Sequence, residues 1–233
     1  MDNLAFGASL EAERGCLRLE EGMPPLPIAA RKSLWYRFWK RFFDIIFSGM
    51  ALAVLSILLL AVSVLVAVQD GFPIFFVQER NGLKGKVFRM YKFRSMCKNA
   101  PEMHRYLLRD NEMDGPAFKM KDDPRITRLG KFLRKTSIDE LPQLLNIIKG
   151  EMSIVGPRPL ATYETEKCNE YQRQRMLVKP GLTCYWQCGG RSDVTFDEWI
   201  EMDLKYIREA SLRTDFKIIL MTVKSVAMGK GAY

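Results

Sequence analysis

Residues 45–68 read IIFSGMALAVLSILLLAVSVLVAV, which is a run of 24 residues without a formal charge. As an α-helix this run would be about 36 Å long, enough to cross a hydrocarbon core of roughly 30 Å. It begins too far along the chain, and is too long, to be the apolar core of a signal peptide. The alternative, a buried helix of a soluble protein, is less favoured at this length. The run therefore predicts a membrane-bound protein.

Basic residues flank this run on both sides, so charge does not indicate which end lies outside. Aromatic side chains are interleaved with the upstream cations, a mixture typical of an interfacial segment. A re-entrant hairpin that returns both ends to the cytoplasm explains the symmetry, whereas a spanning helix would carry one basic flank across. Periodicity does not decide between them. The flanking cations are Arg31, Lys32, Arg37, Lys40 and Arg41 upstream, and Arg80, Lys84, Lys86 and Arg89 downstream.

Outward from this run the chain divides into three parts. Residues 1–30 hold five acidic and two basic residues, the sequence PPLP and no apolar period, which predicts a mobile tail. Residues 31–69 form the interfacial basic and aromatic segment and the membrane helix. Residues 70–233 read as a globular domain in which strand and helix patterns both occur.

The composition excludes several classes of protein. With 48% hydrophobic residues the chain is not globally disordered. A single histidine, His104, excludes a two-histidine metal site and an HExxH helix. Five cysteines without a CxxC pair argue against a disulfide framework, and Cys184 and Cys188 read as buried or idle thiols rather than as a zinc site without further ligands.

The formal net charge of +9 raises the question of a nucleic-acid partner. Much of the basic and aromatic mixture, however, flanks the apolar run. The sequence also contains no Walker P-loop and no GxGxxG motif. We therefore expect no nucleic-acid partner, and a soluble kinase or ATPase would lack its phosphate loop.

Local patterns predict the first elements of the globular part. PIFFVQE and KVFRMYKF flank Asn81-Gly82, a turn signal that predicts a β-hairpin with a loop of two or more residues. Residues 101–112 predict an exposed helix. Farther along, an apolar stripe of helical period is either core packing or a second membrane contact, and the sequence leaves both open. The stripe consists of Phe216, Ile219, Leu220, Val223 and Ala227.

The segment SIDELPQLLNIIKG predicts a helix that begins with a Ser137–Glu140 capping box and ends at Gly150. Asp139 and Glu140 lie at its start, where the partial positive charge of a helix keeps a carboxylate ionised. Such a carboxylate can bind Mg²⁺ or attack phosphorus. The chain has four adjacent acid pairs where chance predicts about three, so adjacency alone carries no signal. Two acids that merely complement a helix dipole are the simpler interpretation.

The next segment, MSIVGPRPL, ends a β-like run in Pro157-Arg158-Pro159. The two prolines fix the backbone on both sides of one arginine, which suits a guanidinium held toward phosphate. Further cations come from Arg134 and from Lys92 and Arg94 of YKFRSM. Brought together by folding, these acids and cations would surround an anionic substrate.

Longer motifs resemble a known family. YKFRSM, DDPRITRLGKFLRKTSIDELPQLLNIIKGEMSIVGPRPL, VKPGLT with the following WQ and GRSD, DLKYI and the terminal GAY are similar to motifs of the bacterial sugar transferase family. These are monotopic polyprenyl-phosphate phosphoglycosyl transferases that begin capsule, exopolysaccharide or O-antigen assembly. The resemblance covers about residues 38–233, and its most specific part runs from Asp122 to Leu160.

The resemblance implies a fold and a reaction. The fold would be a mixed α/β catalytic domain on the cytoplasmic face of the bacterial inner membrane, with a re-entrant membrane helix and amphipathic interfacial helices. The enzyme would transfer sugar-1-phosphate from a UDP-sugar to undecaprenyl phosphate, releasing UMP, through a covalent phosphosugar-aspartyl intermediate. Membrane lipids are further partners, and a homodimer is compatible with the family. The identity of the sugar is not legible.

Residue by residue, the resemblance makes Asp139 the nucleophile and Glu140 its partner in a dyad that holds Mg²⁺. Arg158 and Arg134 would bind phosphate oxygens. Other positions match the family with less defined roles. These are Lys92 and Asp203 near the substrate, Arg191 on the nucleotide side, and the pair Lys40 and Arg41 at lipid headgroups.

The chain departs from the family pattern at two places, and one alternative function stays open. In small members the membrane helix is broken at Ser-Pro, but here Ile57 follows Ser56, so the clearest cause of a kink is missing. Cys184 and Cys188 stand where small or apolar residues are more usual. Asp203 has the plain alternative of an acid on a helix surface. The whole chain could also be a non-catalytic, membrane-anchored scaffold of a polysaccharide assembly complex.

Overall fold

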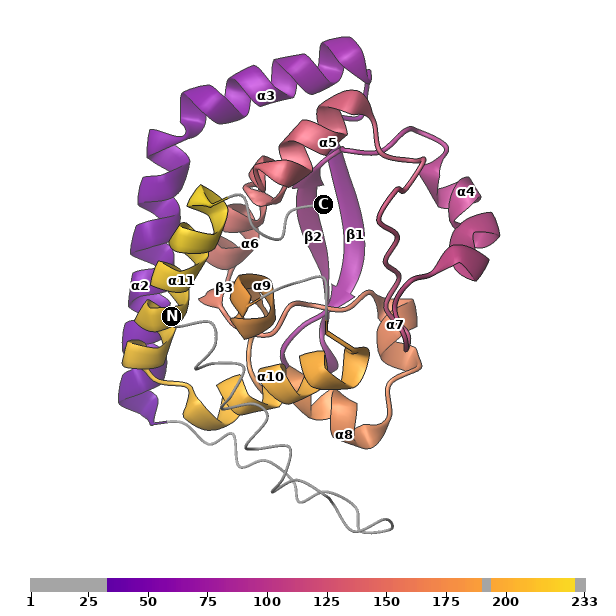
Figure 1. The fold of residues 1–233 in the computed structure, drawn as a ribbon. Helices are drawn as coiled ribbons and strands as arrows, with labels where there is room; N and C mark the ends of the chain where they lie inside the picture. The colour runs from indigo at the N-terminus through magenta and orange to yellow at the C-terminus, as the bar shows by residue number, and fades with distance from the viewer. Residues whose placement is uncertain (1–32, 190–193, 229–233) are drawn as a thin grey trace.

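The apolar run forms two helices rather than one. In the computed structural model, which describes residues 33–189 and 194–228, helix α2 (Leu34–Val54) is followed by α3 (Ser56–Gln69) at an angle of 63°. Figure 1 shows α2 along one side of the molecule and α3 turning across its top. No single helix of the described part is long and apolar enough to cross a membrane, but this bent pair passes the same test of length and composition. The apolar run over 45–68 is therefore broken into a bent pair, as the re-entrant alternative requires, and is not one continuous spanning helix.

The bend occurs at Leu55 and Ser56 without a proline. Leu55 leaves helical geometry with ψ near 3°, and the Ser56 hydroxyl donates a hydrogen bond to the Ala53 carbonyl at 2.8 Å. A serine hydroxyl that bonds back to the preceding turn weakens the regular backbone ladder and bends helices. Ser56 thus marks the break that its position in the sequence indicated, although Ile57 follows it.

The predicted hairpin is confirmed. Strand β1 (Phe75–Asn81) pairs antiparallel with β2 (Val87–Phe93), in a register that sets Phe75 opposite Phe93. The loop contains a short 3₁₀ turn, η1 (Leu83–Gly85), so it is longer than two residues. Figure 1 shows β1 and β2 near the centre of the molecule, and Lys92 is a residue of β2.

A second sheet consists of two short parallel strands, β3 (Ser153–Val155) and β4 (Gly181–Thr183). The chain after β3 passes very close to β4, because a β-carbon on Gly181 would lie 2.1 Å from the Gly156 nitrogen. No side chain fits there, so both glycines are required by close backbone approach. The contact sets the direction in which residues 157–159 leave the sheet.

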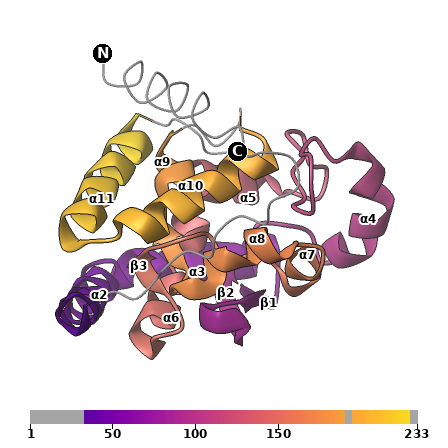
Figure 2. The same ribbon diagram turned by 90° about the horizontal axis from the view of Figure 1, so that it is seen from below.

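Helices and turns surround the two sheets and make the fold mixed α/β, as expected (Figures 1 and 2). The exposed helix expected over 101–112 is present as α4 and η2. The remaining elements are α4 (Ala100–Leu107), η2 (Leu108–Asp110), α5 (Arg128–Lys135), η3 (Ile138–Glu140), α6 (Gln143–Lys149), α7 (Thr162–Glu166), α8 (Glu170–Arg173), η4 (Gln174–Leu177), α9 (Tyr185–Gly189), α10 (Phe196–Glu209) and α11 (Leu212–Ala227).

Three apolar clusters hold these elements together. The largest surrounds α10, where Leu204 and Ile207 are fully buried. A second cluster joins β2 and α6 to the inner side of α2, and a third joins α3 to α5 through Val66 and Leu133. The bent pair is therefore packed onto the domain along both of its helices, while many apolar side chains on its outer side stay exposed.

Candidate active site

The candidate site centres on Glu140, whose carboxylate is held by two cations from distant parts of the chain. Lys92 Nζ, on β2, lies 3.0 Å from Glu140 Oε1. Arg158 Nη2, in the loop after β3, lies 2.9 Å from the same oxygen. The hairpin, the η3 turn and the Pro-Arg-Pro loop therefore meet at one carboxylate, as the sequence motifs suggested.

The turn that carries Asp139 and Glu140 differs from its predicted form. Ser137 adopts a left-handed conformation with φ of 57° and makes no side-chain cap, so the predicted capping box is wrong. Residues 138–140 form the 3₁₀ turn η3, and the α-helix starts only at Gln143. The predicted end at Gly150 is confirmed by its left-handed φ of 83°. The dyad thus lies in a tight turn before the helix rather than in its first turn.

The two carboxyl groups of the dyad have opposite electrostatics. Burial raises the pKa of Asp139, the charge of Lys92 acts against this rise, and the charge of Glu140 adds to it. Burial alone would also raise the pKa of Glu140, but the charges and hydrogen bonds of Arg158 and Lys92 outweigh it and hold that pKa well below its usual range. Arg158 and Lys92 therefore favour the ionised form of Glu140, whereas burial and the Glu140 charge disfavour the ionised form of Asp139.

Arg134 and Arg80 extend the positive charge around the dyad. Arg134, on α5, donates from Nε to the Ser95 hydroxyl at 2.9 Å, and its charge lowers the pKa of Asp139. Arg80, on β1, donates from Nη1 to the Pro159 carbonyl at 2.9 Å and so holds the Pro-Arg-Pro loop. In the sequence Arg80 stood out only as a basic residue beside the apolar run. Its position next to the Pro-Arg-Pro loop becomes visible only from the register of the hairpin and from the path of that loop beside β1.

A second arginine that the sequence reasoning missed supports the loop from behind. Arg175 is buried and donates from Nη2 to the Arg158 carbonyl at 2.7 Å. The same nitrogen lies 2.5 Å from Oδ2 of Asp203, on α10, and the guanidinium stacks over Trp199. Asp203 is 1% exposed, so its alternative as an acid on a helix surface is wrong. Burial raises the pKa of Asp203 to about 6, although the charge of Arg175 opposes the rise.

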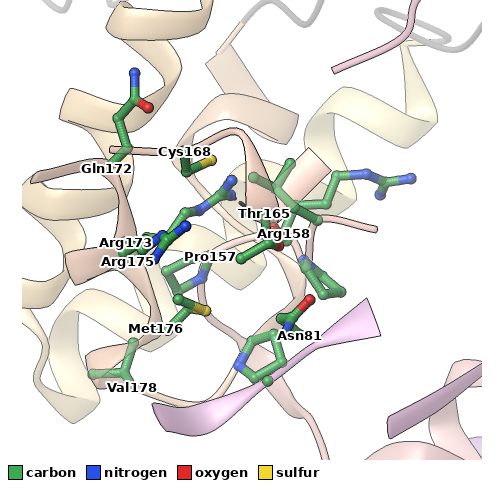
Figure 3. Close-up of a pocket in the computed structure, with 14 residues that line it drawn as sticks. Asn81, Pro157, Arg158, Thr165, Cys168, Gln172, Arg173, Arg175, Met176 and Val178 are labelled. Atoms are coloured by element: carbon green, nitrogen blue, oxygen red, sulfur yellow. Dashed lines mark hydrogen bonds between the residues drawn. The ribbon is translucent and has the colours of Figure 1, made fainter. Parts of the chain in front are cut away.

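Figure 3 shows the small pocket between this arginine and the loop. Pro157, Arg158 and Arg175 line it together with Asn81 of the hairpin. Its cavity volume of about 20 Å³ is room for one water molecule rather than for a substrate. The pocket therefore lies at the support of the Arg158 loop, next to Arg175.

Lys40 and Arg41 are engaged inside the protein. Lys40 Nζ donates to Asp215 at 2.9 Å and to the Val155 carbonyl at 3.0 Å. Arg41 donates to the carbonyls of Ile147 and Ile148 at the C-terminal end of α6. These contacts orient α2 on the domain, and a role at lipid headgroups stays a prediction.

The remaining predicted positions fall into two groups. Arg191 and the tail over residues 1–30 lie outside the described residues. Cys184 is buried, and Cys188 Sγ shares a hydrogen bond with Thr222 Oγ1 at 3.0 Å, in keeping with thiols that serve packing rather than a metal site. Burial and the nearby Asp203 raise the pKa of Cys184 to about 12.

The dyad can be assessed as a metal site by its donor set. In the described part of the chain no group of three or more His, Cys, Asp or Glu side chains is placed to hold a metal ion. Mg²⁺, however, is commonly bound by one or two carboxylates together with substrate phosphates and water. Asp139 and Glu140 supply two such carboxylates, and the buried Asp139 would be stabilised as an anion by a nearby cation. The residues present fit Mg²⁺ on this basis.

Comparison with known proteins places this chain among bacterial sugar transferases. The family described as "Bacterial sugar transferase" matches residues 35–229. The chain is 48% identical to the galactosyl transferase CpsE of Streptococcus agalactiae over 195 residues, which cover 83% of this chain and 43% of that protein. It is 42% identical to the undecaprenyl-phosphate galactose phosphotransferase of Salmonella typhimurium, over 84% of this chain and 42% of that protein.

A shorter relative matches over most of its length. The exopolysaccharide production protein ExoY of Sinorhizobium fredii is 41% identical over 198 residues, which cover 83% of this chain and 88% of that protein. The chain thus spans less than half of the length of the first two relatives and most of the length of the third.

Proposed function

This chain belongs to the bacterial sugar transferase family, and from that premise we propose that it transfers sugar-1-phosphate from a UDP-sugar to undecaprenyl phosphate. The products are undecaprenyl-diphosphate-sugar and UMP, and the step is the first membrane step of polysaccharide synthesis. The observation that carries the proposal is the buried Asp139 beside Glu140, which two cations hold. That arrangement combines a carboxylate nucleophile with positive charge for a diphosphate.

The reaction proceeds in two displacements at one phosphorus. In the first, a carboxylate oxygen of Asp139 bonds to the β-phosphorus, and the bond from this phosphorus to the bridging oxygen breaks, with its electron pair leaving on UMP. In the second, an oxygen of undecaprenyl phosphate bonds to the same phosphorus, and the bond to Asp139 breaks, which regenerates the carboxylate. Neither displacement requires the nucleophile to lose a proton, so a chain with one histidine can carry out both.

The side chains around Asp139 supply the electrostatics of these displacements. Arg158 and Lys92 hold Glu140 and bring positive charge to the phosphoryl oxygens, and Arg134 adds a third cation next to Asp139. Mg²⁺ held by Asp139 and Glu140 would offset the charge of the diphosphate. Two of the relatives have galactose in their names, so UDP-galactose is the first donor to test.

The same proposal includes attachment to the cytoplasmic face of the bacterial inner membrane. A polyprenol stays in the bilayer and a nucleotide sugar stays in water, so the reaction needs a site at the boundary. We propose that the bent pair α2–α3 enters the bilayer as a re-entrant hairpin, which its angle of 63° and its exposed apolar outer side support. The exposed apolar side chains of α11 would add a second, interfacial contact.

Intact-protein mass spectrometry tests the chemistry most directly. The purified chain, given Mg²⁺ and UDP-galactose without acceptor, should gain the mass of one phosphosugar. Undecaprenyl phosphate should then discharge the adduct. Asp139→Asn should form no adduct, whereas the exposed Asp197→Asn, from another adjacent acid pair, should behave like the unmodified protein.

Other outcomes would change the proposal in specific ways. Lipid-linked product without any adduct would mean direct transfer and would reduce Asp139 to a metal ligand. An adduct that persists in Asp139→Asn would place the nucleophile elsewhere. No adduct and no product, with UDP-galactose and with other UDP-sugars, would leave the membrane-anchored scaffold as the better interpretation.

A further inference from the structure

Helix α2 carries a polar stripe on its inner face, within a helix that is otherwise rich in exposed apolar side chains. Tyr36, Lys40 and Asp44 follow one another at intervals of four residues and therefore lie along one side of the helix. Tyr36 and Lys40 both donate to Asp215 Oδ2, on α11, at 3.0 and 2.9 Å. The stripe is turned toward the domain rather than away from it.

Asp44 and Lys40 together hold β3 along its whole length. Oδ1 of Asp44 accepts hydrogen bonds from the Ser153 hydroxyl at 3.0 Å and from the Ile154 backbone N–H at 2.9 Å. Lys40 donates to the carbonyl of Val155 at 3.0 Å. Three successive residues of the strand are thus bonded to two side chains that lie one helical turn apart.

The chain that leaves β3 leads directly to the site. Gly156 follows the strand, and its N–H bonds to the Thr183 carbonyl at 3.0 Å, where close approach to β4 leaves no room for adjustment. Two residues later, Arg158 meets Glu140 at 2.9 Å. A shift of β3 along α2 would therefore be passed on to the Arg158 guanidinium.

The same helix also holds the segment that follows the dyad. Arg41 donates to the carbonyls of Ile147 and Ile148, at 2.5 and 2.7 Å, in the last turn of α6. Helix α6 starts three residues after Glu140. Lys40 and Arg41, which are adjacent in α2, therefore bind β3 and α6. The chain after β3 carries Arg158, and the chain before α6 carries Glu140.

From this geometry we infer that Asp44 is a positioning residue, which acts through β3 to aim Arg158 at Glu140. The expected effect on kcat rests on the proposed function, whereas the expected effect on the backbone of β3 rests on the geometry alone. Asp44 is 5% exposed, and a carboxylate buried on a largely apolar helix is costly unless it is well bonded. Its two hydrogen bonds to β3 meet that requirement. The packing of α2 on the domain and the alignment of Arg158 with Glu140 consequently depend on the same hydrogen bonds.

The test compares Asp44→Ala with two matched variants of the full chain in detergent micelles or nanodiscs. Asp44→Asn keeps an oxygen that can accept both bonds. Ser48→Ala lies one turn farther along the same buried face, and the Ser48 hydroxyl has no hydrogen-bond partner within the described structure. We expect Asp44→Ala to lower kcat on the order of 10- to 100-fold, as misplacement of a positioned group does. Asp44→Asn and Ser48→Ala should stay within about threefold.

Coupling to Arg158 separates positioning from a general loss of stability. In an Arg158→Lys background, Asp44→Ala should lower kcat by less than about threefold, because the contact that it aligns is already impaired. If Asp44→Ala lowers kcat in the Arg158→Lys background by as large a factor as it does in the unmodified protein, the inference is overturned. So would an Asp44→Asn variant as slow as Asp44→Ala, since the acceptor oxygen would then not be what matters.

Backbone amide exchange gives a readout that does not depend on turnover. Asp44→Ala should speed exchange in the peptide over residues 153–160, and Ser48→Ala should not. If Asp44→Ala exchanges faster but the unmodified protein transfers no sugar phosphate, the positioning geometry is upheld and the proposed function fails. Unchanged exchange over 153–160 would overturn the inference whatever the kinetics show.

Discussion

At the scale of single residues, the two neighbouring carboxyl groups of the dyad differ in their electrostatics. Glu140 accepts from Lys92 and Arg158 and is kept ionised by them. Asp139 is buried without comparable compensation, which raises its pKa. A higher pKa makes a carboxylate a stronger nucleophile once it is ionised, while the Glu140 anion keeps the two cations in place.

The raised pKa of Asp139 predicts the acid side of the pH profile. Only the ionised form can attack phosphorus, so adduct formation should fall as pH drops through a pKa that lies above the usual aspartate value of 3.8. Arg134→Gln removes a charge that lowers this pKa, so the acid limb should move to still higher pH. The rate of adduct formation between about pH 4 and about pH 8 measures both. A limb that stays in place or moves to lower pH in Arg134→Gln would contradict this assignment.

Cys184 should be chemically silent in the folded protein. Burial raises its pKa to about 12, so almost no thiolate exists near neutral pH, and the thiolate is the reactive form. Alkylation followed by peptide mass spectrometry should label the half-buried Cys97 in the folded protein and the buried Cys184 only after denaturation. Equal labelling rates at Cys97 and Cys184 in the folded protein would show that the region around α9 opens readily.

At the scale of elements, sequence and structure agree where a local signal determines geometry. Asn81-Gly82 predicted the hairpin, and Gly150 predicted the end of α6. The capping box at Ser137 failed because this serine lies in a left-handed turn after α5, where its backbone N–H donates to the Arg134 carbonyl and its side chain caps no helix. The bend at Leu55 could not be predicted with certainty from the sequence, because no proline follows Ser56.

The candidate site was only partly readable from the sequence. Motifs identified Asp139, Glu140, Lys92 and Arg158, since these lie within continuous conspicuous segments. Arg175 escaped notice because its partner Asp203 lies 28 positions away on another helix. Such pairs become visible only when the elements are packed.

Helix α11 resolves its predicted stripe into two parts. Ile219 packs against the main core, beside the fully buried Ile218, whereas Phe216, Leu220 and Val223 are exposed. Because an exposed apolar face of this kind suits an interface, a photoreactive residue at Val223 should crosslink to lipid in nanodiscs. The same residue at the exposed Lys217 should crosslink far less. Equal crosslinking, or crosslinks to a second copy of the chain, would rule against a lipid contact on this face.

At the scale of the whole molecule, the distribution of charge predicts a dependence on metal. Glu140 is shared between two cations, and a diphosphate brings further negative charge to the same place. Removal of divalent cations with EDTA should abolish adduct formation, and Mg²⁺ should restore it. Glu140→Gln should raise the Mg²⁺ concentration needed for half-maximal rate. Full activity in EDTA would show that the protein cations suffice.

The long reach of the α2 contacts also imposes an order on biosynthesis. Lys40 precedes its partner Val155 by 115 positions and Asp215 by 175. At roughly 5–20 residues per second, a ribosome delivers Asp215 roughly 10–35 s after Lys40. Until β3 is made, Lys40 and Asp44 lack all their partners in the domain, and until α11 is made, Tyr36 and Lys40 still lack Asp215, so polar groups of α2 stay in contact with water throughout that interval. The inner face of α2 must therefore remain wet until α11 emerges, and the helix can settle fully only then.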